Sequence, residues 1–168
     1  MEFMRDLIVI AHDIRSTHNV GAILRTSDGF GVTEVLFSGY TPFPRQSHDP
    51  RLPHLADKIH RDIHKTALGA ESSVPQRLVT DIAHEVSTLR QQGYRIVGLE
   101  QNERSVRLDT YSPSQKIVLL LGEERYGLSS ELLKMCDDVI EIPMQGDKES
   151  FNVSVATGIA LYHLAYAK

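Results

Sequence analysis

Short runs of consecutive apolar residues are the feature of this sequence that most limits its fold. Leu7–Ala11 (LIVIA) and Lys116–Leu121 (KIVLLL) contain the runs LIVI and IVLLL, which are apolar at successive positions rather than at every second position. Strands with that pattern are covered on both faces, as they are in a parallel sheet. Three further segments also have strand character: Glu34–Phe37, Arg95–Leu99 and Asp138–Ile142. The sequence therefore predicts a mostly parallel sheet.

Segments with apolar residues at helical spacing lie between these strands. We expect helices over Asn19–Phe30, Asp81–Gln92 and Asn152–Ala167. Repeated strand–helix–strand units of this kind define an α/β protein with helices on both faces of the sheet. One long irregular region, Gly39–Pro53, is rich in proline, and a loop of that length is usually functional or disordered.

Length and composition exclude several classes of protein. The 168 residues fit a single domain over residues 1–168. A single cysteine, Cys136, excludes an internal disulfide framework and a multi-cysteine zinc site. His60 and His64 lack acidic or cysteine partners at metal-binding spacing, so we expect no metal. No apolar run reaches the roughly 18 residues of a membrane span, and we expect a soluble, cytoplasmic protein.

The charge balance narrows the expected partners. The chain has 18 Lys and Arg against 22 Asp and Glu, which gives a net charge of −4. A protein that bound nucleic acid over its whole surface would be basic, whereas a local basic patch is compatible with this balance.

The first polar stretch that could carry chemistry follows the first predicted strand. Residues 13–19 lie where open α/β sheets bind ligands, beyond the carboxyl ends of the strands. Asn19 is either the N-cap of the next helix or a site residue. Arg25 lies on that helix, and its planar guanidinium suits a phosphate or a carboxylate.

A second stretch follows the strand that ends at Leu121. Gly122 lets a ligand approach the backbone, whose amides and carbonyls can bind an adenine or a ribose. Glu123 and Glu124 are adjacent, so they point in different directions and are not a general acid–base pair.

The third stretch precedes the last predicted helix. Ser150, Asn152 and Ser154 crowd its start although one helix needs one N-cap, so the spare polar side chains suggest ligand contact. The helix itself is apolar nearly all round and must be covered on two sides. In a chain of this size a partner subunit is the natural second cover.

Together the three stretches resemble the motifs of the SpoU (TrmH-like) branch of the SPOUT superfamily. Members of this branch are S-adenosylmethionine-dependent RNA ribose 2′-O-methyltransferases. The matching residues are Asn19, Gly21 and Arg25 in the first motif, Gly122, Glu124, Gly127, Leu128 and Ser129 in the second, and Ile142, Pro143, Met144, Gly146, Ser150, Asn152, Val153, Ser154, Val155 and Ala156 in the third. Phe151 stands where the family usually has leucine. Arg125 and Tyr126 stand where the family favours smaller residues.

The resemblance implies a fold and an assembly that the pattern of strands and helices does not. Members tie the C-terminal segment into a deep trefoil knot, whereas general rules of topology exclude knots. The knot loops, here around Leu99–Glu100, Gly122–Leu128 and Ile142–Phe151, would hold the methyl donor. Members are homodimers packed through the last helix. We expect one catalytic domain over residues 1–168 without an appended RNA-binding domain, so that the dimer itself holds the RNA.

The same resemblance assigns residues to roles. S-adenosylmethionine would be bound by groups near Leu99, Gly122, Ile142, Met144 and Phe151, without a metal. The residues around the chemistry would be Arg25, Asn19, Glu124, Ser150 and Asn152. Because an arginine with a pKa above about 12 is a poor base, we expect Arg25 to stabilise the developing alkoxide, in its own or in the partner's site. The other four would orient the ribose, Arg25 and the knot.

Basic residues are the candidates for contacts with RNA phosphates: Arg15, Arg45, Arg51, Arg61 and Lys65. Arg45–Lys65 carries a local excess of positive charge, although a mobile surface loop of mixed charge would look the same. We expect tRNA as the substrate before rRNA. The alternatives are a non-catalytic dimeric RNA-binding relative and a methyltransferase that acts on a base. A generic nucleotide-binding protein is disfavoured, because no phosphate loop or dinucleotide fingerprint is present.

Overall fold

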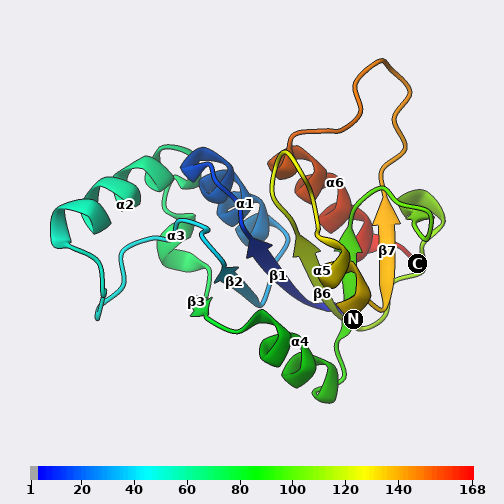
Figure 1. Cartoon of the computed structure of the whole chain (residues 1–168), viewed down its shortest axis with the longest axis horizontal. Helices are drawn as coiled ribbons and strands as arrows, with labels where there is room; N and C mark the ends of the chain where they lie inside the picture. Colours follow the sequence, from blue (N-terminus) through cyan, green and yellow to red (C-terminus); the bar gives the residue numbers. More distant parts are fainter. Residues whose placement is uncertain (1–3) are drawn as a thin grey trace.

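The computed structural model describes residues 4–168, which form one sheet of seven strands with helices on both faces (Figure 1). The strand order is β3-β2-β1-β6-β4-β7-β5, and all neighbouring strands are parallel. The predicted α/β fold with a parallel sheet is confirmed. The C-terminal trefoil knot stays a prediction.

The five predicted strands are present, and two short ones were missed. The strands are β1 Asp6–His12, β2 Glu34–Ser38, β3 Gln76–Val79, β4 Arg95–Leu99, β5 Val106–Arg107, β6 Lys116–Leu121 and β7 Asp138–Glu141. The missed strands, β3 and β5, form the two edges of the sheet, where a strand needs less apolar surface.

The three predicted helices are also present. The helices are α1 Thr17–Gly29, α2 Pro53–Ala67, α3 Ala70–Ser73, α4 Ile82–Gln91, α5 Ser130–Met135 and α6 Val153–Tyr166, and Leu108–Thr110 forms the 3₁₀ helix η1. The interpretation of Arg45–Lys65 as one surface loop is wrong, because the second half of this segment belongs to α2. The helix begins at Pro53, a residue suited to the first helical position.

Successive side chains of β1 enter two different cores, which explains its unbroken apolar run. Leu7 and Val9 pack with buried residues of α1, α2 and α6 on one face of the sheet. Ile8 and Ile10 pack with buried residues of α4 and α5 on the other face. Both faces of β1 are therefore covered, as the sequence pattern predicts.

Gly21 brings α1 into close contact with α2. A Cβ atom at this position would lie 2.3 Å from the carbonyl oxygen of Ile63 and 2.9 Å from the amide nitrogen of Ala67. Both are backbone atoms of α2 and cannot rotate away, so the first motif requires a glycine here for packing. No helix in residues 4–168 combines the length and the apolar character needed to cross a membrane.

Candidate functional site

A cavity of about 310 Å³ opens at the carboxyl edge of the sheet. Its wall is formed by the loops that follow β4, β6 and β7 and by the first turn of α6: Leu99–Gln101, Leu121–Gly127, Glu141, Ile142, Glu149–Phe151, Val153 and Ala156. This is the edge at which open α/β sheets bind ligands, and the volume lies within the usual range for small-molecule sites. The three knot loops that the resemblance implies, around Leu99–Glu100, Gly122–Leu128 and Ile142–Phe151, thus line one cavity.

Most of the predicted cofactor residues border this cavity. Leu99, Gly122, Ile142 and Phe151 are among its lining residues. Met144 is half-buried in the same loop as Ile142 but does not line the cavity. The wall therefore combines apolar side chains with the backbone of a strand end.

Gly122 is required because the turn after β6 folds back over the end of its own strand. A Cβ atom on Gly122 would lie 2.5 Å from the carbonyl carbon of Gly127 and 2.7 Å from the amide nitrogen of Leu128. Gly127 has φ +68°, and a Cβ atom there would overlap the carboxylate of Glu100. That carboxylate accepts a hydrogen bond of 2.9 Å from the Leu128 amide. Glu100 thus connects the loops after β4 and β6.

Glu123 and Glu124 point in different directions, as the sequence predicts for adjacent residues. Glu123 is buried, and its Oε2 accepts hydrogen bonds from the amides of Arg125 and Tyr126. Glu124 accepts hydrogen bonds from the amides of Arg15 and Ser16, at 2.9 and 3.1 Å. Each carboxylate fixes a different piece of backbone, so the two do not form an acid–base pair.

Asn19 is not the N-cap of α1, which corrects one of the two interpretations of this residue. Ser16 caps the helix, and its Oγ accepts a hydrogen bond from the amide of Asn19. The Asn19 side chain instead donates to Glu124 Oε1 at 3.0 Å and accepts from Asn152 Nδ2 at 3.1 Å. Asn152 caps α6 by accepting from the amide of Ser154. A continuous chain of hydrogen bonds therefore joins the three motifs.

Glu124 is the charged residue at one end of this series of hydrogen bonds. Partial burial would raise its pKa, but hydrogen bonds from the Arg15 amide, the Asn19 side chain and the Ser16 amide outweigh that effect and lower the pKa. Glu124 stays ionised at neutral pH with both oxygens occupied. The structure therefore gives Glu124 a positioning role, in which it holds the start of α1 against the turn after β6.

Glu124→Gln is expected to reduce the free energy of unfolding at pH 7 by about 1 kcal/mol, a figure that allows for solvent screening at this half-buried position. A depressed folded-state pKa stabilises the protein above the unfolded value of about 4.3, and this contribution is lost as the pH falls through the folded-state value. The difference in the free energy of unfolding between the original chain and the variant should therefore be smaller in acid. Urea unfolding of both proteins at pH 7 and near pH 4 measures it. An equal deficit at both pH values would contradict the ionic role of Glu124.

Arg25 is exposed on α1 and does not line the cavity. Within residues 4–168 its side chain has no hydrogen bond or ion pair. Its helical neighbours Ala22 and Thr26 line a shallow hollow between α1 and α6. Of the predicted catalytic residues, the structure thus brings Asn19, Glu124 and Asn152 into contact and places exposed Ser150 on the cavity wall, while Arg25 stands apart.

The outer face of α6 is apolar and exposed. Val155, Ile159, Tyr162 and Tyr166 are between 37% and 63% exposed. Phe30 of the turn after α1 adds edge-on contacts to both tyrosines. The opposite face of α6 is buried in the core. The all-round apolar pattern of this helix therefore corresponds to one covered face and one uncovered face.

The structure corrects the role of Arg51 among the basic candidates. Its guanidinium is half-buried, donates to Asp49 Oδ1 at 2.8 Å and to the carbonyl oxygen of Phe43 at 2.9 Å, and stacks 3.6 Å from the centre of the Phe43 ring. The hydrogen bond from Arg51 lowers the pKa of Asp49 far below its usual value. With its donors used in this way, Arg51 anchors the loop before α2.

The other basic candidates lie at two places. Arg45 pairs with Asp57 and Lys65 with Asp62, while Arg61 is exposed with no ion-pair partner among residues 4–168. These three lie on α2 or just before it, at the end of the molecule opposite β7 (Figure 1). Arg15 instead lies close to the cavity, with its Nη1 3.6 Å from Glu123 Oε1.

The family model that this chain matches is that of the SpoU rRNA Methylase family, over residues 6–162. The chain is 33% identical over 158 residues to the 23S rRNA (guanosine-2′-O-)-methyltransferase RlmB of Xanthomonas campestris pv. campestris, a match that covers 94% of this chain and 57% of that protein. The chain thus spans a little over half the length of the curated relatives it matches.

Solved structures of similar fold come from the same group of proteins. The A. aeolicus TrmH/SpoU tRNA modifying enzyme matches with a TM-score of 0.78 and 28% identity, over 97% of this chain and 75% of that one. The AdoMet-bound rRNA methyltransferase from Sinorhizobium meliloti matches with a TM-score of 0.78 and 24% identity, over 98% of this chain and 57% of that one. The second likeness shows the fold alone.

Proposed function

The chain belongs to the SpoU rRNA methylase family, and from this premise we propose that it transfers a methyl group from S-adenosylmethionine to a ribose 2′-hydroxyl of RNA. The observation that carries the proposal is the junction of the three motifs beside one cavity. The hydrogen-bonded chain from Glu124 through Asn19 to Asn152 fixes that junction. Residues of all three family motifs are thereby held together beside the cavity, as a shared site requires.

The cavity fits the proposed cofactor in size and in the chemistry of its wall. The apolar side chains of Leu99, Ile142 and Phe151 offer surface for an adenine, and the turn Gly122–Gly127 forms part of the same wall, where its backbone could meet polar groups of the nucleoside. When bound, S-adenosylmethionine supplies a methyl group activated by its sulfonium. The protein then has to hold the ribose 2′-hydroxyl next to that methyl group, while the hydroxyl proton passes to solvent with assistance from the bound RNA phosphate.

We propose that Arg25 stabilises the negative charge that develops on the ribose oxygen. An arginine remains protonated under ordinary conditions, so it stabilises an alkoxide better than it removes a proton. Because Arg25 does not border the cavity of its own chain, we propose that it serves the cavity of a partner subunit. The hydrogen-bonded residues Asn19, Glu124 and Asn152 position α1, and with it Arg25.

The partner subunit we propose is a second copy of this chain, packed through α6. The exposed apolar face of α6 and the hollow it forms with α1 support this assembly, because an apolar surface of this kind is usually covered in a soluble protein. Arg25 projects from the same region of α1 as the hollow-lining Ala22 and Thr26. Sedimentation velocity measures the assembly directly, and a monomer at micromolar concentration would contradict it.

For the RNA we propose tRNA before rRNA, with phosphate contacts from Arg15, Arg45, Arg61 and Lys65. Arg51 is left out because the loop before α2 already uses its donors. The two named relatives act on different RNAs, one on 23S rRNA and one on tRNA, so both substrates belong in the test.

Mass spectrometry of nucleosides tests the proposal. Unmodified total tRNA and rRNA are incubated separately with the protein and S-adenosylmethionine, then digested and compared with samples that lack protein. A new 2′-O-methylnucleoside is the expected product. A methylated base would contradict the ribose assignment. No product and no binding of S-adenosylmethionine in calorimetry would favour the non-catalytic RNA-binding alternative.

A further inference from the structure

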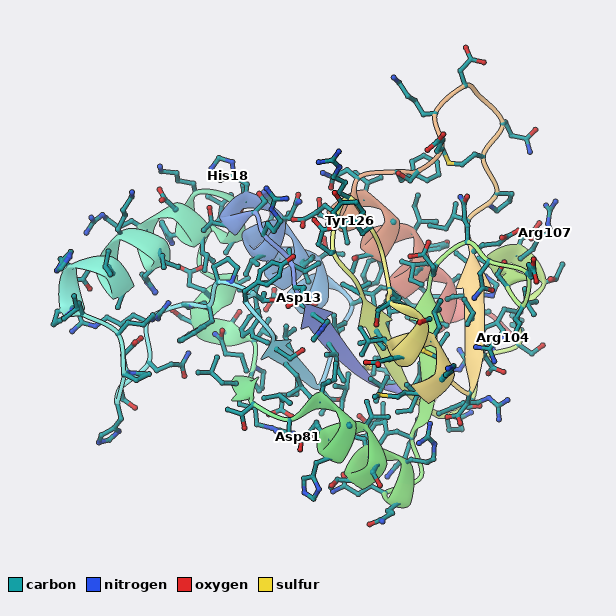
Figure 2. All side chains as sticks on the ribbon, viewed as in Figure 1. Asp13, His18, Asp81, Arg104, Arg107 and Tyr126 are labelled. Carbon is teal, nitrogen blue, oxygen red and sulfur yellow. The ribbon has the colours of Figure 1, made fainter. Side chains whose placement is uncertain are left out.

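Arg125 and Tyr126 line the cavity, Arg15 lies beside its buried Glu123, and Tyr40 is bonded to Asp13 in the loop that leads to Arg15. We call Arg15, Tyr40, Arg125 and Tyr126 the rim. Tyr126 lies at the tip of the loop between β6 and α5 (Figure 2), where it lines the cavity and is 75% exposed. Tyr40 follows β2 and is 58% exposed. Large aromatic rings that are this exposed beside a ligand site are candidates for contact with the substrate.

The backbone beneath Tyr126 is fixed although its ring is free. The buried carboxylate of Glu123 accepts hydrogen bonds from the amides of Tyr126 and Arg125, at 2.6 and 3.1 Å. The amide of Gly127 donates to the carbonyl of Glu123 at 2.8 Å and closes the turn. The turn therefore presents the Tyr126 ring at a defined place, with the Arg125 guanidinium 5.2 Å from the ring centre.

Of the other two rim residues, Arg15 is paired with the same carboxylate and Tyr40 is held by Asp13. Arg15 Nη1 lies 3.6 Å from the second oxygen of Glu123, and Arg15 is mostly exposed. Tyr40 is held through its amide, which donates to Asp13 Oδ1 at 3.0 Å. Partial desolvation, followed by the charges of Asp13 and Glu123, raises the pKa of Tyr40, so its hydroxyl stays neutral.

Charge around the cavity restricts where an RNA backbone can run. Carboxylates line the cavity at Glu100, Glu123, Glu124, Glu141 and Glu149 and would repel phosphates. Arg125 lines the same cavity, and Arg15 lies beside Glu123. Phosphates can therefore approach the opening most favourably along these two arginines.

Building on the proposed function, we propose that the rim selects an unpaired stretch of RNA, in which Tyr126 stacks on a base while Arg125 and Arg15 contact the flanking phosphates. A base inside a duplex has both faces covered by its neighbours and offers no surface to Tyr126. An unpaired loop offers that surface, and stacking accepts any base because each has a π-face. The substrate class is thus a nucleotide in a single-stranded loop rather than in a helix.

Fluorescence anisotropy with a labelled stem–loop RNA tests the stacking contact without requiring turnover. Tyr126→Ala is expected to weaken binding about tenfold, whereas Tyr126→Phe, which keeps the aromatic face, should bind within about twofold of the original chain. The original chain should also bind the stem–loop about tenfold more tightly than the same strand annealed to its complement. Equal binding by all three proteins, or equal binding of stem–loop and duplex, would overturn the proposal.

Arg125→Ala tests the phosphate contact through salt dependence. The slope of log Kd against log salt should fall by about one, the amount expected for one lost phosphate contact. Lys134→Ala is the matched control, because it removes an exposed cation at the far end of α5 and should leave the slope unchanged. Equal slopes for Arg125→Ala and the original chain would overturn this contact.

Failure of this inference is distinguishable from failure of the proposed function. Calorimetry with S-adenosylmethionine and the nucleoside assay report on the function in the original chain, whatever the variants do. If the original chain methylates RNA while Tyr126→Ala binds the stem–loop normally, only the stacking proposal is wrong.

Discussion

Arg25→Ala is expected to lower the rate of methyl transfer at saturating RNA and S-adenosylmethionine by about a hundredfold or more, without changing the affinity for the cofactor. Removal of one group that stabilises a developing oxyanion typically costs this much. The fold should not suffer, because Arg25 is exposed and has no hydrogen-bond or ion-pair partner within residues 4–168. Single-turnover methylation measures the rate, and calorimetry measures cofactor affinity. Lys134→Ala serves as the charge-matched control and should keep the original rate.

Mixing two inactive variants shows which subunit's cavity Arg25 serves. Ile142→Trp would fill the cavity and block the cofactor while leaving Arg25 in place. If Arg25 acts on the partner's cavity, a mixed dimer of Arg25→Ala and Ile142→Trp contains one complete site, and activity should reappear on mixing. A mixture that stays inactive, although sedimentation shows mixed dimers, would place Arg25 in its own subunit's site. Full activity of Arg25→Ala alone would contradict any catalytic role.

Burial on both faces made the central part of the fold predictable from the sequence. The runs in β1 and β6 are apolar at every position because both cores need them. The edge strands β3 and β5 gave no such signal, because they are four and two residues long and carry polar side chains. Helix α2 was missed for a related reason, since only Ala56, Ile63 and Ala67 of its fifteen residues are buried.

The site was predictable as a set of loops but not as a set of contacts. Polar and glycine residues after strand ends, together with the motif spacing, indicated the loops after β6 and β7, whereas the loop after β4 was implied only by the family resemblance. The pattern could not decide whether Asn19 caps α1 or belongs to the site, because asparagine is among the preferred N-cap residues. In the structure Ser16 is the cap. The side chain of Asn19 instead donates a hydrogen bond to Glu124, which lies more than a hundred positions away in sequence, so a local pattern could not reveal this contact. Arg51 was misjudged because its role depends on how the loop around Asp49 folds.

Gly122→Ala is expected to lower the affinity for S-adenosylmethionine about a hundredfold and the free energy of unfolding by about 2 to 3 kcal/mol. The added Cβ atom would meet the backbone of Gly127 and Leu128 at 2.5 to 2.7 Å, and backbone cannot rotate away as a side chain could. The turn after β6 must then lift from the strand end, which moves the cavity wall that includes Glu123 and Tyr126. Calorimetry and urea unfolding measure the two effects.

Gly146→Ala is the matched control, because this glycine belongs to the third motif but a Cβ atom there has nothing within 4 Å. The substitution should change the free energy of unfolding by less than about 0.5 kcal/mol and leave cofactor binding intact. If Gly122→Ala lost stability but bound the cofactor normally, the close turn would serve the fold and not the cavity. If both variants behaved like the original chain, the turn would not need to rest on the strand end at all. The expected contrast between two glycines of the same family pattern would show that the second motif requires glycine for space, whereas the third does not.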